Sequence, residues 1–215
     1  MISSNTCRLC VITDPSFARG LSHFEIVARA VAGGASMIQL RDKVAGPRQL
    51  LSEARRIAQL CRDRGVCFIV NDRLDLALAA DADGVHLGQD DLPPKAARAI
   101  LSKGKLLGVS THSVEQALEA AEQGADYLGI GPIFATGTKA TGYEPKGCDI
   151  IRQLRARIDL PLIAIGGITL SNVGEVIQAG ATGAAVISAI VGADDITAAT
   201  AAFSAAIHQA AQPHR

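Results

Sequence analysis

The sequence predicts an α/β fold, a single-domain (β/α)8 TIM barrel, on three observations. Short runs of β-branched and aliphatic residues alternate with helical patterns eight times. The runs are nearly continuously apolar, which is typical of parallel strands covered by helices. The length of 215 residues suits one such barrel. The runs are residues 9–14, 37–42, 67–72, 84–89, 106–111, 127–132, 162–167 and 184–189.

Helix signals lie between the runs. Ser22 and Glu25 have the spacing of a capping box, in which the two side chains satisfy the first backbone N–H groups of a helix. Ser113 and Gln116 repeat this spacing, and Ser171 is predicted to open a later helix. These signals place a helix after the first, fifth and seventh runs.

The domain is expected to cover residues 1–215. The alanine-rich segment 196–211 predicts a final helix that covers the barrel, and the tail from 209 to 215 is expected to fray. A doubly wound open sheet is the alternative fold, because strand order cannot be read from a sequence. Ligands bind at the carboxyl ends of the strands in both folds, so functional residues are sought there.

The composition argues against several classes of partner. The 21 basic and 21 acidic residues cancel, so neither nucleic acid nor an anionic membrane is an expected partner. No apolar stretch reaches the roughly 20 residues that span a bilayer, and the first residues lack a secretory pattern. Five cysteines without disulfide-framework spacing fit a cytoplasmic location. Cys7 and Cys10 form a C-x-x-C, but we expect no zinc or redox site, since no second pair accompanies them and they should face opposite ways.

Polar residues at the end of the second run predict an anion site. Gln39, Arg41 and Lys43 share one parity, so they face the same side of the strand and its exit. Inward-facing cations are costly without an anion, which favours a phosphate or diphosphate ligand. Salt bridges to neighbouring strands are the alternative.

Two carboxylates predict a Mg²⁺ site beside these cations. Asn71 and Asp72 end the third run, and Asp91 follows the fourth. Mg²⁺ commonly takes one or two carboxylates and completes its shell with water and phosphate oxygens. The alternative is that the aspartates cap the following helices. His86 has the opposite parity to Asp91, and we expect it to pack between strand and helix.

A second anion site is predicted at the last two strands. The glycine pair 166–167 and the Ile187–Ser188 pair follow the seventh and eighth runs, where barrels of this kind usually hold phosphate. Ser110, at the exit of the fifth run, can donate a hydrogen bond to a phosphate oxygen. A glycine pair that makes only a turn is the alternative.

The segment 131–147 is long for a connection and has no apolar periodicity. Thr136, Thr138 and Lys139 supply two hydroxyls and a cation, which suit a loop that closes over two phosphorylated reactants. A solvated surface loop is the alternative.

Seven blocks of the sequence follow one another in a specific order and spacing: QLRDK at 39–43, ND at 71–72, GVHLGQDD at 84–91, GVSTHS at 108–113, GPIFATGTK at 131–139, AIGGI at 164–168 and AVISAI at 185–190. Together they resemble the thiamine-phosphate synthase family, and the resemblance covers nearly the whole chain. It implies a transferase that joins hydroxymethylpyrimidine diphosphate to hydroxyethylthiazole phosphate, giving thiamine phosphate and pyrophosphate.

The resemblance also implies roles for individual residues. Mg²⁺ would be held by Asp72 and Asp91. The predicted catalytic residues are Lys139, Arg41, Lys43 and Ser110. The pyrimidine diphosphate would be bound by Gln39, Arg41, Lys43, Asn71, Ser110 and Lys139. The thiazole phosphate would be bound by Thr136, Gly137, Thr138, Gly167, Ile187 and Ser188.

Two positions depart from the family pattern, and related functions remain open. Members often have an aromatic residue in place of Cys10 and a proline in place of Ala135, which leaves the pyrimidine pocket and the stiffness of the loop open. A thiazole tautomerase of the same barrel would lack the QLRDK run and the threonine loop. A non-catalytic ligand sensor would not need both aspartates. A homo-oligomer is compatible with the sequence.

Overall fold

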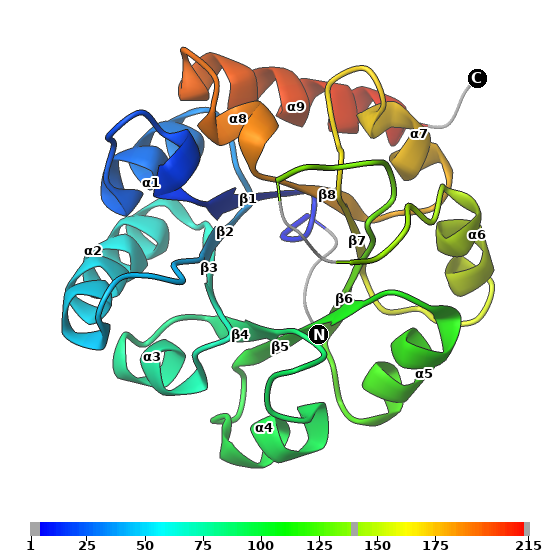
Figure 1. Cartoon of the computed structure of the whole chain (residues 1–215), viewed down its shortest axis with the longest axis horizontal. Coiled ribbons are helices and arrows are strands. Elements are labelled where there is room, and N and C mark those ends of the chain that lie inside the picture. Colours follow the sequence, from blue (N-terminus) through cyan, green and yellow to red (C-terminus); the bar gives the residue numbers. More distant parts are fainter. Residues whose placement is uncertain (1–4, 139–141, 213–215) are drawn as a thin grey trace.

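The computed structural model describes residues 5–138 and 142–212. Eight parallel strands form a closed barrel in chain order, with β8 pairing with β1 (Figure 1). The predicted TIM barrel is confirmed, and the open sheet is wrong. The strands are β1 (Leu9–Thr13), β2 (Met37–Leu40), β3 (Cys67–Asn71), β4 (Gly84–Leu87), β5 (Leu106–Thr111), β6 (Tyr127–Ile130), β7 (Leu162–Ile165) and β8 (Gly183–Val186).

All strands except β5 end one to three residues before the predicted boundary. The polar residues at the ends of the predicted runs therefore lie beyond the hydrogen-bonded ladder. Arg41 follows the last residue of β2, and Asp72 follows the last residue of β3. Because the ladder does not fix these residues, other contacts have to position their side chains.

The helices form a ring outside the barrel (Figure 1). The final helix packs against the first and the seventh, which closes the ring. None of the helices in residues 5–138 and 142–212 is long and apolar enough to cross a membrane. The helices are η1 (Pro15–Phe17), α1 (His23–Ala32), α2 (Pro47–Arg64), α3 (Leu74–Ala79), α4 (Pro94–Ile100), α5 (Val114–Glu122), α6 (Asp149–Arg155), α7 (Val173–Gln178), α8 (Ser188–Val191) and α9 (Ile196–Ala210).

The predicted helix starts are confirmed at α1 and α5 but not at α7. Ser22 forms the complete capping box of α1. Ser113 caps α5, although the Gln116 side chain accepts the His112 N–H instead of completing the box. The prediction for Ser171 is wrong, since α7 begins at Val173 after Asn172, whose Oδ1 instead accepts the Thr169 N–H at 2.8 Å.

The predicted final helix is confirmed over 196–210, so the first two residues of the expected tail are helical. Residues 213–215 lie outside the described residues.

Two apolar layers follow from the alternation of side chains along the strands. One lies between barrel and helices, and the other fills the barrel interior with residues such as Ile12, Met37 and Tyr127. Cys7 and Cys10 both belong to the interior layer, so the expectation that they face opposite ways is wrong. Cys7 precedes β1, and strand alternation does not apply there. Burial raises the pKa of the Cys7 thiol to about 12.

Candidate active site

Two adjoining cavities lie at the carboxyl ends of the strands. The inner cavity, about 50 Å³, extends into the barrel, and the outer cavity, about 420 Å³, lies beneath the segment after β6. Both are lined by Ser110, Ile165 and Ile187, so a molecule in one cavity would contact a molecule in the other.

The predicted anion-binding residues are distributed between these cavities as two sets. Of the pyrimidine set, Gln39, Arg41, Asn71 and Ser110 line the inner cavity, whereas Lys43 lines neither cavity. The thiazole set lines the outer cavity with Thr136, Gly137, Thr138, Gly167, Ile187 and Ser188. Cys10 also lines the inner cavity, and Ala135 lines the outer one, so both departures from the family pattern lie in the site. Lys139 lies outside the described residues.

Arg41 lines the inner cavity and Lys43 follows it two residues later, and each contacts a carboxylate that follows a neighbouring strand. Arg41 Nη1 donates to Asp14 Oδ2 at 2.8 Å, and both side chains are largely buried. Lys43 Nζ donates to Asp72 Oδ2 and is half-exposed. The salt bridges considered as an alternative are therefore present. The Asp14 contact uses one of five guanidinium N–H donors, which leaves donors that could serve an anion.

The predicted metal ligands Asp72 and Asp91 are neighbours. Asp72 has a φ of 61°, a left-handed conformation that aspartate tolerates better than most residues. Its N–H donates to the His86 carbonyl at 2.8 Å. Asp91 Oδ2 accepts the Gly88 N–H at 2.7 Å. Burial, together with the Asp72 carboxylate, raises the pKa of Asp91, while Gly88 and Lys43 oppose this shift.

This pair of carboxylates fits a divalent cation on chemical grounds. Two adjacent carboxylates disfavour each other's ionisation, and a cation between them relieves the repulsion. Within residues 5–138 and 142–212, no group of three or more His, Cys, Asp or Glu is placed to hold a metal. Mg²⁺ does not require such a group, because water and phosphate oxygens can supply its other ligands.

The glycine pair at the end of β7 allows the segment after β6 to pack closely. Gly166 and Gly167 have φ values of 94° and 65°. A Cβ on Gly167 would lie 2.5 Å from the Ala135 carbonyl oxygen. Phe134 N–H also donates to the Gly166 carbonyl at 3.0 Å. The pair therefore does more than make a turn, since a side chain at either position would push the loop away.

The far side of this loop crosses to β8 (Figure 1). Thr138 Oγ1 and Ser188 Oγ are 2.9 Å apart, and Thr138 N–H donates to Thr136 Oγ1 at 3.2 Å. The threonines thus lie against the exit of β8 and line the outer cavity. The alternative of a purely solvated loop is wrong for this part of the segment.

The return of the loop is fixed by a second set of contacts. Lys146 N–H donates to the Pro132 carbonyl at 2.8 Å. The Tyr143 ring stacks on the His112 ring with centroids 3.7 Å apart, and His112 Nδ1 donates to the Gly131 carbonyl at 2.5 Å. Both ends of the loop are therefore attached to the barrel.

Comparison with known proteins places the chain in a family. The family model described as thiamine monophosphate synthase matches residues 9–190. The chain belongs to the thiamine monophosphate synthase family. It is 52% identical over 192 residues to the thiamine-phosphate synthase of Chloroflexus aurantiacus, covering 89% of this chain and 88% of the relative. It is 50% identical over 201 residues to that of Methanocella arvoryzae, covering 94% and 95%.

A solved member of the thiamine monophosphate synthase family has the same architecture. Thiamine phosphate pyrophosphorylase from Pyrococcus furiosus is 39% identical, with a TM-score of 0.90, covering 96% of this chain and 98% of that one. The chain is thus an enzyme, a transferase of thiamine biosynthesis.

His86 also belongs to the site, and the predicted position of its side chain between strand and helix is wrong. Its ring points into the barrel, with Nε2 2.9 Å from Ser110 Oγ and Nδ1 3.1 Å from the Tyr127 hydroxyl. A Cβ on Gly108 would lie 2.1 Å from Tyr127, so the glycine makes room for this pair. The parity count failed because it continued past Leu87, where β4 ends. Alternation counted only within the residues of β4 predicts that His86 faces the barrel interior.

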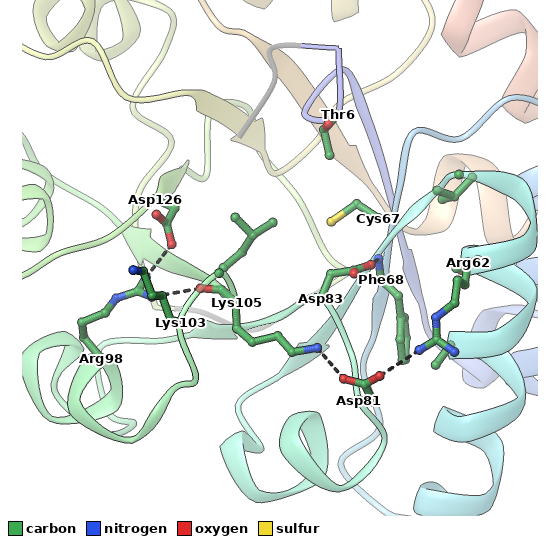
Figure 2. A pocket seen from close by; sticks show the side chains of 16 residues that line it. Thr6, Arg62, Cys67, Phe68, Asp81, Asp83, Arg98, Lys103, Lys105 and Asp126 are labelled. Carbon is green, nitrogen blue, oxygen red and sulfur yellow. Dashed lines mark hydrogen bonds and ion pairs between the residues drawn. The ribbon is translucent and has the colours of Figure 1, made fainter. Parts of the chain in front are cut away.

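A larger cavity, about 740 Å³, lies at the opposite end of the barrel (Figure 2). Most of its charged residues pair with one another: Asp81 lies between Lys105 and Arg62, and Arg98 contacts Asp126. Catalytic residues of TIM barrels lie at the carboxyl ends of the strands, so we assign the chemistry to the smaller cavities.

Proposed function

We propose that this enzyme forms thiamine phosphate from hydroxymethylpyrimidine diphosphate and hydroxyethylthiazole phosphate, with release of pyrophosphate. One observation carries the proposal: four of the six predicted pyrimidine-binding residues and all six predicted thiazole-binding residues line two cavities that meet at Ser110 and Ile187. An enzyme that joins two rings needs two such sites in contact, because the reacting atoms must approach closely.

The pyrimidine diphosphate is assigned to the inner cavity. Gln39 is buried, and with Asn71 and Ser110 it offers amide and hydroxyl groups to the ring. Arg41 and Lys43 lie at the rim, where the diphosphate would project. Lys139 is proposed as a further cation on the basis of the sequence.

Asp72 and Asp91 are proposed to hold Mg²⁺. When bound, the ion would neutralise negative charge on the departing pyrophosphate. Lys43 already contacts Asp72, so the lysine and the metal site would act on the same phosphate group.

The thiazole phosphate is assigned to the outer cavity. The hydroxyls of Thr136, Thr138 and Ser188 would donate to the phosphate, and Gly137 and Gly167 would let it approach the backbone. Ile187 lies between the cavities and would contact both rings.

The proposed reaction needs charge stabilisation and no general base. The bond from the pyrimidine methylene carbon to the diphosphate oxygen breaks, and its electron pair leaves with pyrophosphate. The thiazole nitrogen then supplies the pair for the new carbon–nitrogen bond. Arg41, Lys43 and Lys139 stabilise the leaving group, and the loop after β6 excludes water that would capture the cation.

A coupled assay tests this function directly. Purified protein is given both phosphorylated rings and Mg²⁺, and thiamine phosphate is measured as fluorescent thiochrome after oxidation. Product that depends on both rings and on Mg²⁺ is expected. Isomerisation of a carboxythiazole phosphate without any joined product would instead assign the chain to the tautomerase branch, and ligand binding without turnover would assign it to the sensors.

The reaction is proposed to take place in the cytoplasm. The five cysteines are free thiols, as a reducing compartment would keep them. Fractionation of cells that express the protein from its own gene tests this location.

A further inference from the structure

Two buried side chains and one partly buried carboxylate link the end of β1, the start of α1 and the segment after β2. Thr13 Oγ1 accepts the Arg41 N–H at 3.2 Å and lies 2.8 Å from His23 Nδ1. His23 Nε2 lies 2.9 Å from Asp42 Oδ2. Thr13 is 0% exposed and His23 is 5% exposed, so these contacts are shielded from water. Thr13, His23 and Asp42 are here called the β1–β2 network. Its chain of contacts starts at the backbone of Arg41 and ends at Asp42, the next residue in the sequence.

The second Asp42 oxygen holds the next part of the same segment. Asp42 Oδ1 accepts the N–H groups of Val44 at 2.7 Å and Ala45 at 2.8 Å. Burial alone raises the pKa of Asp42, but the hydrogen bonds from His23, Ala45 and Val44 hold it below its usual range. Asp42 is therefore an ionised acceptor, and the segment is held on both sides of it.

The contacts of His23 place a hydrogen on one of its ring nitrogens. An ionised Asp42 can only accept, so His23 Nε2 carries a hydrogen. Nδ1 faces the Thr13 hydroxyl, which can either accept a hydrogen from it or donate one to it. His23 therefore bridges Thr13 and Asp42.

The location of the network suggests what it does. β2 ends at Leu40, so the sheet ladder does not fix Arg41 or Lys43. Asp42 reaches His23 at the start of α1, whereas Arg41 lines the inner cavity and Lys43 reaches Asp72. Holding Asp42 against α1 consequently fixes the backbone between the two cations and the directions in which their side chains leave it.

We propose that Thr13, His23 and Asp42 are positioning residues that orient Arg41 and Lys43 for the diphosphate. This inference rests on the proposed function. The lining residues of the inner and outer cavities within the described chain do not include these three, so they act through Arg41 and Lys43. Loss of the network should therefore impair the use of the pyrimidine diphosphate and leave the binding of the thiazole phosphate unchanged.

Substitutions at Thr13 separate this role from general stability. Thr13→Val keeps the shape and removes the hydroxyl, and Thr13→Ser restores it. Thr200→Val is the matched control, because Thr200 is also 0% exposed and its hydroxyl donates to the Ile196 carbonyl at 2.7 Å in α9. Thr13→Val should lower kcat/KM for the pyrimidine diphosphate by about tenfold, while KM for the thiazole phosphate stays within about twofold.

The remaining variants and the wild type serve as controls for Thr13→Val. Thr13→Ser and Thr200→Val should both stay within about threefold of wild type. The positioning role is overturned if the wild type is active and a folded Thr13→Val has unchanged kinetics. It is also overturned if Thr13→Val changes the kinetic constants for both substrates equally. An inactive wild type would instead overturn the proposed function.

Nitrogen NMR of His23 in the wild-type protein provides a second test. A hydrogen on Nε2 is expected, because the contact with an ionised Asp42 requires one, and a His23→Gln spectrum assigns the signals. An Nε2 without a hydrogen would overturn the network as described.

Discussion

Arginines occur at both ends of the barrel and have different partners there. At the amino-terminal end, Arg98 contacts the carboxylate of Asp126 but also donates to the Gly124 carbonyl at 3.2 and 3.1 Å and to the Lys105 carbonyl at 2.9 Å. Arg155 similarly donates to the Gly180 carbonyl at 3.1 Å and the Leu160 carbonyl at 3.1 Å. At the carboxyl-terminal end, Arg41 contacts the carboxylate of Asp14.

The difference in partners separates structural from functional cations. Backbone carbonyls at turns are fixed by the fold, and an arginine that satisfies several of them stabilises the connections between helices and strands. A cation held by one carboxylate beside a cavity keeps donors for a ligand. Both the end of the barrel and the partners of the cation therefore matter. Substitutions at Arg41 and Arg155 test this distinction, and substitutions at Gly167 and Tyr143 test the loop over the outer cavity.

Arg41→Ala should have the largest effect on turnover. We expect kcat/KM to fall by about 100-fold or more, roughly 2.7 kcal/mol of transition-state stabilisation, with little change in melting temperature. Thiochrome kinetics and thermal unfolding measure the two effects. Arg62→Ala is the control, since it removes an exposed cation at the other end of the barrel. Equal losses of activity in both variants would remove the distinction.

Arg155→Ala should show the opposite pattern. Burial lowers the pKa of Arg155, and its removal leaves several carbonyls without their donor. The free energy of unfolding should fall by about 2–4 kcal/mol, with kcat unchanged at temperatures where the variant is folded. Urea unfolding measures this loss. Arg152→Ala, which breaks an exposed pair with Asp149, should cost less than about 1 kcal/mol.

Gly167→Ala should affect the outer cavity more than the inner one. Its positive φ and the close Ala135 carbonyl mean that a Cβ must displace the loop. KM for the thiazole phosphate should rise by about tenfold, and KM for the pyrimidine diphosphate should change less. Gly174→Ala is the control, because its Cβ would meet only Ala210 at 3.9 Å. A thiazole phosphate KM that is unchanged in Gly167→Ala would contradict the role of the loop.

Tyr143→Ala should have the smallest effect of the four. Loss of the stacking on His112 removes about 0.5–1.5 kcal/mol from the closed loop, which predicts a KM for the thiazole phosphate raised about threefold to tenfold. Tyr143→Phe keeps the ring and should behave like wild type. Steady-state kinetics of the two variants provide the comparison, and a Phe variant as impaired as the Ala variant would rule out stacking as the cause.

Strand alternation explains what the sequence could predict. Gln39 and Arg41 were placed towards the interior correctly, because their parity was counted within or directly beyond β2. The same rule failed for His86, because the residue count continued past the end of β4, and for Cys7, because this residue precedes β1. Local hydrogen bonds explain the failure at Ser171, since its hydroxyl contacts Thr169 Oγ1 at 2.9 Å and α7 begins only after Asn172, without a side-chain cap.

The contacts that position the cations could not be predicted. Arg41 bonds to Thr13 and Asp14, which are 28 and 27 residues away, and His23 reaches Asp42 across 19 residues. Many polar pairs at such separations are compatible with the same barrel. Only the packing of α1 against the end of β2 selects among them.

Calorimetric titration of pyrophosphate tests most directly the claim that cations and a metal ion at the carboxyl-terminal end hold the leaving group. Binding to the wild type should require Mg²⁺, should be lost in Arg41→Ala and should persist in Arg62→Ala. Binding that is equally strong without Mg²⁺ and in Arg41→Ala would contradict the claim.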